Sequence, residues 1–167
     1  IAAYINIFRA IQLLVFIVFV YYGIAIQFEL SISPIQAGIL ALTLQYSAWL
    51  GEIFRSGIQA IPHGQREAAL SVGMSRPQTF FRVILPQAVR IVIPPTGNMF
   101  IGMIKDSSLV YIMGVWELTF RAQKIGRQNF RNLETFLIAA AFYWILTVIF
   151  QLLQGRLEEY MARGERR

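Results

Sequence analysis

The sequence predicts an all-α membrane protein, built as a bundle of about four transmembrane helices. Its 167 residues are 56% hydrophobic and only 14% charged, whereas a soluble domain has roughly 45–50% apolar and about 25% charged residues. The mean hydropathy is +0.54, and most charged residues fall between long apolar runs. Cysteine is absent, which excludes disulfides and thiolate chemistry. We expect a single transmembrane domain over residues 1–167.

Four apolar segments are candidate crossings, because a membrane helix needs about 20 mainly apolar residues. They cover about residues 8–27, 34–61, 86–104 and 134–154. Within the first, the uncharged stretch from Ala10 to Ile26 has one strongly polar residue, Gln12. Ser33 and Pro34 suit the N-cap and first turn of the second. Pro94 and Pro95 predict an irregular third helix packed inside the bundle, because neighbouring groups must then satisfy its backbone.

The polar segments between these crossings carry most of the charge. Residues 105–133 are expected at the outer surface, and the basic part from 117 onward predicts a helix lying along the membrane interface. Asn132 can cap the last crossing. Residues 155–167 predict a charged tail.

The distribution of cations predicts the orientation in the membrane. With four crossings, the N-terminal end, the loop over residues 55–90 and the C-terminal tail share one side, which carries about ten of the 15 lysines and arginines. Because cytoplasmic loops are enriched in these residues, we expect residues 62–86 and the C-terminus in the cytoplasm. The net charge of +6 is therefore attributed to topology, and no nucleic-acid partner is expected.

The longest stretch without a membrane-like apolar run lies between the second and third predicted crossings. We expect it to begin with a short helix that has Glu67 in its first turn, where a carboxylate interacts favourably with the helix dipole. Ala68, Ala69 and Val72 would share one low face at helical spacing. Gly73 is expected to end this helix, because a left-handed residue is least costly for glycine.

A second short helix is expected to follow. Ser75 suits its N-cap, Phe80, Phe81 and Ile84 would face the bundle, and Pro86 would break it before the chain re-enters the membrane. Two interpretations of this double helix stay open at this point. It is either a rigid element that docks in a groove of a partner or an amphipathic helix on the membrane surface.

The pattern of these residues resembles a known motif. Glu67-Ala68-Ala69, Gly73 and Val83-Ile84-Leu85-Pro86 look like the EAA loop of permease subunits of ATP-binding cassette importers, with Val83 where isoleucine is usual. Further matches to the polar amino-acid branch are Tyr4-Ile5-Asn6-Ile7-Phe8-Arg9 with Leu13-Leu14, Glu52-Ile53-Phe54-Arg55, Gly57-Ile58, Ile61-Pro62 and Lys105-Asp106-Ser107-Ser108-Leu109. Ala10-Ile11-Gln12 departs from the Gly/Thr-Pro-type residues common there.

The resemblance covers nearly the whole chain and implies a type I importer permease fold. Family members carry one more crossing before the first one here, and the chain starts at Ile1 in apolar sequence, so we expect a preceding segment. The resemblance implies a multi-pass protein of a prokaryotic inner membrane, embedded in lipid. Two permease subunits, as a homodimer or close heterodimer, would form the pathway for a polar amino acid delivered by an extracytoplasmic solute-binding protein.

A separate ATPase subunit would bind ATP and magnesium and dock on the EAA loop. This chain lacks a GxxxxGK[ST] phosphate loop, so no cofactor is expected on it and ATP hydrolysis is expected on the partner chain. An alternative function is a non-transporting membrane anchor for a cytosolic complex. A small membrane-embedded enzyme is disfavoured, because one histidine and no cysteine leave no nucleophile–base pair.

Two groups of residues are candidate sites. Glu67, Ala68, Ala69 and Gly73 are the predicted ATPase-coupling residues. Asn98, Lys105, Asp106, Ser107 and Ser108 are candidates for the substrate pocket, because charge at membrane depth normally faces a cavity or a partner. Alternatively, the charged pair in that group only marks the outer end of its segment.

Glu52, Trp144 and His63 are three further candidates. Glu52 could line the inner end of the pathway, or form a structural pair with Arg55 three residues on. Trp144 is expected to serve packing, with a pocket wall as the alternative. His63 is expected to belong to a turn, since no other metal-ligand types lie nearby in the sequence.

Overall fold

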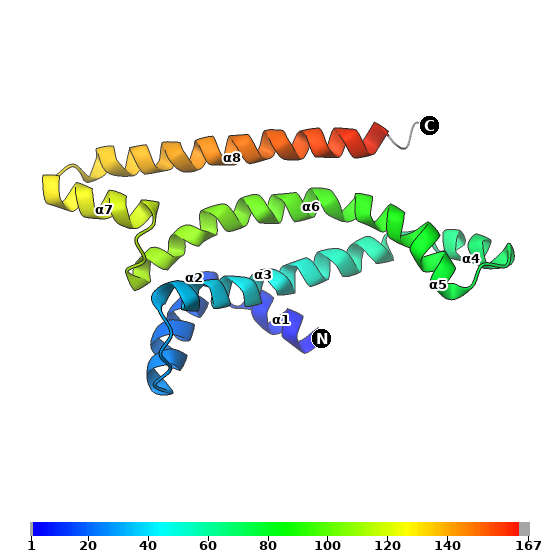
Figure 1. The fold of residues 1–167 in the computed structure, drawn as a ribbon, viewed down its shortest axis with the longest axis horizontal. Helices are drawn as coiled ribbons and strands as arrows, with labels where there is room; N and C mark the ends of the chain where they lie inside the picture. Colours follow the sequence, from blue (N-terminus) through cyan, green and yellow to red (C-terminus); the bar gives the residue numbers. More distant parts are fainter. Residues whose placement is uncertain (1, 164–167) are drawn as a thin grey trace.

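Three long helices form the body of the molecule (Figure 1). In the computed structural model, which describes residues 2–163, they are α3 (Pro34–Gln59), α6 (Leu85–Asp106) and α8 (Asn132–Arg163). Helix α6 lies between the other two and packs against both. No strand occurs among residues 2–163. The predicted all-α bundle is therefore confirmed.

The first predicted crossing is bent rather than straight. It consists of α1 (Ala2–Ala10), α2 (Leu13–Val18) and a π-helical stretch, η1 (Phe19–Ala25). The two parts meet at an angle of 101°, because Gln12 adopts an extended conformation with ψ of 131°. The side-chain Nε2 of Gln45 on α3 donates a hydrogen bond of 2.7 Å to the carbonyl of Ile11. A side chain from a distant helix thus supplies a hydrogen-bond donor to one of the backbone carbonyls at the break.

Helix α3 begins as predicted and packs very closely on α6. The Ser33 hydroxyl accepts from the Gln36 N–H at 3.3 Å, and the Gln36 side chain accepts from the Ser33 N–H at 2.8 Å, which completes a capping box. Near the other end, a Cβ placed on Gly57 would lie 2.1 Å from Cγ1 of Val92 on α6. Only glycine lets the two backbones approach this far.

Helix α6 is continuous, which corrects the prediction of an irregular helix. Pro94 and Pro95 both lie inside it. The side chain of Gln154 on α8 donates a hydrogen bond of 3.0 Å to the carbonyl of Pro94, so a neighbouring helix supplies polar contact at the proline pair, as such sites require.

The predicted break at Pro86 is also wrong. Helix α5 (Arg76–Thr79) continues through a π-helical turn, η2 (Phe80–Ile84), directly into α6. The wider turn ends just before Pro86, where a backbone N–H is missing in any case. The Gln87 side chain donates to the carbonyl of Val83 at 2.8 Å. The helix therefore accommodates the missing N–H of Pro86 and does not end there.

The chain turns back after α6 through a 3₁₀ stretch, η3 (Ser107–Met113), and then forms α7 (Leu118–Asn129), which packs on the start of α8 (Figure 1). Glu117 caps α7 by accepting from the N–H groups of Thr119 and Phe120 at 2.7 and 2.6 Å. The predicted polar helix in this region is confirmed. Asn132, however, is the first residue of α8 and not its cap, and α8 extends into the predicted tail.

Hydropathy distinguishes α8 from the other helices. Among residues 2–163 it is the one unbroken helix that is long and apolar enough to cross a membrane, and two bent helix pairs would qualify if each formed one crossing. Helix α3 falls short of this measure because polar residues such as Gln45 interrupt its apolar run. Four crossings at the stated positions therefore stay a prediction.

Candidate functional site

The short helix α4 (His63–Ser71) and α5 lie at one end of the molecule (Figure 1). The C-terminal end of α8 lies toward the same end, and α7 lies at the opposite end. This placement agrees with a loop element and a C-terminus on one side of a membrane. We call α4, α5 and η2 together the loop element.

Gly73 ends α4 as the sequence predicts. Its φ is +85°, and its N–H donates to the carbonyl of Leu70 at 3.0 Å while the Met74 N–H donates to the carbonyl of Ala69 at 3.2 Å. These two bonds form a Schellman motif. Ser75 then caps α5, since its hydroxyl accepts from the Gln78 N–H at 3.4 Å. The loop element is thus fixed by backbone hydrogen bonds on both sides of the turn.

The faces of α4 differ from the predicted ones. The helix starts at His63, directly after Pro62, so Glu67 lies in the second turn and not the first. Ala69 is 6% exposed and faces the chain itself, whereas Ala68 is exposed and Val72 is 75% exposed. The low face that a partner could reach therefore includes Ala68 but not Ala69.

The second helix of the element follows the prediction more closely. Ile84 is buried with Ile61 and Ala88, and Phe80 packs against this cluster. Phe81 is 64% exposed, so the expectation that it faces the bundle is wrong. Two adjacent helical positions point in different directions, and only one of the two phenylalanines can reach the cluster.

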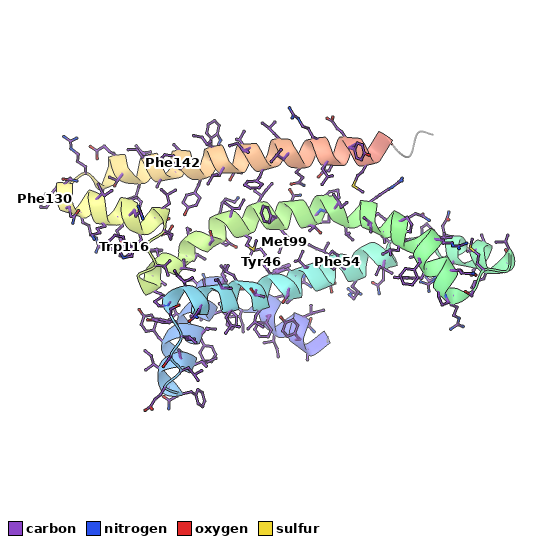
Figure 2. All side chains as sticks on the ribbon, viewed as in Figure 1. Tyr46, Phe54, Met99, Trp116, Phe130 and Phe142 are labelled. Atoms are coloured by element: carbon purple, nitrogen blue, oxygen red, sulfur yellow. The ribbon has the colours of Figure 1, made fainter. Side chains whose placement is uncertain are left out.

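A second candidate site is a cavity of about 480 Å³ between α1, α3 and α6. We call it the central cavity. Its polar and aromatic lining residues are Arg9, Gln12, Gln45, Tyr46, Trp49, Asn98 and Asp106. Figure 2 shows Tyr46 and Met99, which also line it, in the space between α3 and α6. Both signs of charge, an amide-rich wall and an aromatic surface thus meet in one cavity.

The polar groups of the central cavity are only partly paired. The Tyr46 hydroxyl donates to Oδ2 of Asp106 at 2.7 Å. The Arg9 guanidinium lies 4.5 Å from the centre of the Trp49 ring and 3.9 Å from Oε1 of Glu52. Nε of Arg9 and Oε1 of Gln45 are buried and have no hydrogen-bond partner. Because buried unpaired polar atoms are unfavourable, the cavity suits a polar ligand that carries both donors and acceptors.

The structure separates the predicted pocket residues. It brings Asn98 and Asp106 to the central cavity. Lys105 is exposed and does not line the cavity. Ser107 and Ser108 begin η3, where the Ser107 hydroxyl donates to the carbonyl of Ile104 at 2.7 Å. Of the five predicted residues, Asn98 and Asp106 line the central cavity and the other three do not.

The remaining candidates have local roles. Glu52 accepts from Nε of Arg55 at 2.9 Å and also pairs with Nη2 of Arg55, so the predicted pair is present. His63 is the first residue of α4 rather than part of a turn. Trp144 is 68% exposed on α8 and does not line the central cavity. Among residues 2–163, no three His, Asp or Glu side chains are close enough to hold a metal ion.

Arg9 and Gln45 were not identified as site residues from the sequence. Arg9 lies on α1, before the 101° bend, and lines the cavity together with residues of α3 and α6. Gln45 carried a usable signal, because an uncharged polar side chain within an apolar helix usually faces the interior of a bundle. The first residue depended on long-range contacts, whereas the second could have been found.

The fold and these two sites define a class of protein: a helical membrane subunit with a rigid loop element at one end and a polar cavity between its helices. Residues 1–163 match the family described as "binding-protein-dependent transport system inner membrane component". The chain belongs to this family and is a membrane component of a transport system rather than an enzyme.

Individual relatives agree with this assignment. The chain is 41% identical over 165 residues to the probable amino-acid permease protein YxeN of Bacillus subtilis strain 168, covering 98% of this chain and 74% of the relative. It is 38% identical to the glutamine transport system permease protein GlnP of Escherichia coli strain K12, covering 95% and 73%. The chain spans about three quarters of each.

Solved structures share the fold. An amino acid ABC transporter crystallised with histidines superposes with a TM-score of 0.90 at 38% identity, covering 95% of this chain and 74% of that one. The MetNI methionine ABC transporter in an inward-facing conformation gives a TM-score of 0.76 at 22% identity, covering 96% and 73%. The second likeness concerns the fold alone.

Proposed function

We propose that this chain forms the translocation pathway of an ATP-driven importer for a polar amino acid, and that α4 docks on a separate ATPase subunit. Relatives named as amino-acid and glutamine permeases support the substrate class. A second permease subunit would complete the pathway, and an extracytoplasmic binding protein would deliver the amino acid. The loop element and the C-terminus would lie in the cytoplasm, as the cation distribution indicates.

One observation carries the proposal: the loop element and the central cavity are joined by a single run of helix. From Arg76 to Met113 the chain forms one helical run, and no sharp bend divides it. Asp106, at the cavity, lies on this run. Movement imposed on α5 from outside can therefore reach the cavity through backbone hydrogen bonds and not through a loose loop.

Four coupling residues are proposed, with two different roles. Glu67 and Ala68 are exposed on α4 and would contact the ATPase. Ala69 and Gly73 face the chain or shape the turn, so they would position α4. A charged side chain at Gly73 would disrupt the left-handed turn, and a cation at Glu67 would reverse the charge offered to the partner.

The central cavity is the proposed substrate site. An amino acid carries a carboxylate and an ammonium group, and the cavity offers the guanidinium of Arg9 and the carboxylate of Asp106. Asn98 and Gln45 can donate to or accept from polar groups of the same ligand. Lys105, Ser107, Ser108 and Glu52 are not proposed as direct contacts.

Reconstituted transport tests the coupling role. We expect Glu67→Lys and Gly73→Asp to abolish amino-acid-stimulated ATP turnover in liposomes while the protein stays inserted and folded. Glu134→Lys, which reverses an exposed charge at the opposite end of the chain, is the matched control and should retain activity. Normal stimulation in both loop variants would contradict the coupling role.

Ligand binding tests the cavity separately. We expect the double variant Asn98→Ala with Asp106→Ala to lose amino-acid binding. Lys105→Ala, which removes a charge next to Asp106 but outside the cavity, should retain it. Equal affinities in all three proteins would remove the cavity as the substrate site.

Orientation is tested by labelling. The chain has no cysteine, so Val72→Cys introduces a single, 75% exposed position. A membrane-impermeant maleimide should label it in inside-out vesicles and not in right-side-out vesicles. The reverse result would place the loop element outside the cell.

A further inference from the structure

A separate cavity lies inside the loop element. Its volume is about 430 Å³. It is lined by Arg66 and Leu70 from α4, Arg76 and Thr79 from α5, and Phe80 and Ile84 from η2. We call it the loop cavity. It shares no lining residue with the central cavity, and the function proposed above does not use it.

The loop cavity carries positive charge without a counter-ion. Among residues 2–163, both ion pairs involve Glu52, and no carboxylate lies within ion-pair distance of Arg66 or Arg76. Two guanidinium groups on one cavity, each with several N–H donors, attract an anion. Arginine is well suited to phosphate because its planar fork can donate two parallel hydrogen bonds.

Thr79 adds a polar group that has no internal partner. The residue is 2% exposed, it lines the loop cavity, and its hydroxyl makes no hydrogen bond within the protein. Leaving such a buried group unpaired is unfavourable. A ligand oxygen in the cavity would accept from this hydroxyl and remove that cost.

The remaining wall is apolar and lies where the long helices end. Ile84 is buried with Ile61 and Ala88, which places the inner wall of the cavity between the residues just after α3 and the first turns of α6. Phe81, beside this wall, is 64% exposed, as aromatic residues at membrane interfaces often are. An apolar wall next to two arginines matches a molecule with an anionic end and a hydrocarbon end.

We propose that the loop cavity binds the phosphate headgroup of an anionic phospholipid from the cytoplasmic leaflet. Arg66 and Arg76 contact the phosphate, and Thr79 donates a hydrogen bond to it. Basic pockets at the cytoplasmic ends of membrane helices are suited to such headgroups. An acidic side chain of a partner protein would satisfy the arginines but would leave the wall formed by Phe80 and Ile84 without an apolar ligand. The charge and the apolar wall together therefore favour lipid.

Lipid retention tests the proposal. The full-length protein, with the subunits that copurify, is placed in nanodiscs of phosphatidylcholine with a small fraction of phosphatidylglycerol, and bound lipid is counted by native mass spectrometry. We expect the double variant Arg66→Gln with Arg76→Gln to bind phosphatidylglycerol about tenfold or more weakly, since hydrogen bonds to charged groups are stronger than those between neutral groups. The control, Arg121→Gln with Arg127→Gln on α7, removes the same charge elsewhere.

Thr79→Val distinguishes a specific headgroup site from general electrostatic attraction to the membrane. It keeps the charge and the shape and removes only the hydroxyl, and we expect about a threefold or greater loss of bound phosphatidylglycerol, the low end of the effect of one such bond. No loss in this variant, or an equal loss in the α7 control, would overturn the proposal. So would binding of inorganic phosphate without selectivity for the lipid, or loss of a copurifying subunit from the Arg66 and Arg76 variant with unchanged lipid binding.

Discussion

Replacing Gly57 by alanine is expected to loosen the packing of α3 on α6. The added Cβ would lie 2.1 Å from Cγ1 of Val92, far inside the optimal carbon separation of about 3.5–4.0 Å. Val92 is β-branched and has little rotamer freedom in a helix. It cannot turn away, so the two helices must move apart.

The size of the effect follows from two opposing contributions. Overpacking a tight interface typically costs about 1–3 kcal/mol, whereas alanine is favoured over glycine in a helix by roughly 1 kcal/mol. Gly51 on the same helix provides the matched control, because a Cβ there would meet only Cδ1 of Ile5 at 3.7 Å. The propensity gain is common to both variants. We therefore expect Gly57→Ala to be about 1–3 kcal/mol less stable than Gly51→Ala.

Unfolding in detergent measures this difference. Purified variants are titrated with a denaturing detergent and followed by circular dichroism, and the expected gap corresponds to roughly 5- to 150-fold in the unfolding equilibrium. Size-exclusion chromatography confirms that each variant starts folded. Equal stability of the two variants would refute the close contact between α3 and α6.

Three further predictions concern single hydrogen bonds and backbone strain. Gly73→Ala should lower the melting temperature, because a left-handed alanine costs about 1–2 kcal/mol; Gly73→Asn should recover part of the loss, and Gly64→Ala, with no atom within 4 Å and no positive φ, should not lower it. Gln45→Leu should destabilise by about 1–3 kcal/mol in the same assay, because the carbonyl of Ile11 loses its partner, and an unchanged midpoint would contradict this. Glu117→Ala should cost about 1 kcal/mol through the lost cap, whereas Glu117→Gln, which can still accept, should cost less; equal losses would argue against the cap.

Signals that act over a few residues could be predicted from the sequence. The caps at Ser33 and Ser75 and the stop at Gly73 are present as expected, because each depends on one side chain or one φ value close to its own backbone. Apolar and polar segments are also local features of the sequence, so their alternation was sufficient to predict the fold class.

Features that depend on distant contacts could not be predicted. The bend at Ile11 involves Gln45, which is 34 residues further along the chain. The continuity across Pro86 depends on a π-helical turn that no residue pattern marks. Which side of α4 is buried depends on its packing against η2 and α5, and the spacing of residues along α4 does not fix that. Two lining residues of the central cavity, Asn98 and Asp106, are polar groups eight residues apart on one helix and could be selected from the sequence, whereas Arg9 could not.

The close contact between Gly57 and Val92 divides the long helical run into two arms of similar length. Val92 is 16 residues from Arg76 and 14 residues from Asp106, which at about 1.5 Å per residue corresponds to arms of roughly 24 and 21 Å. If this contact acts as a fulcrum, any rigid tilt moves the two ends by nearly equal distances in opposite directions. A displacement of α5 would then move Asp106 by almost the same distance in the opposite direction.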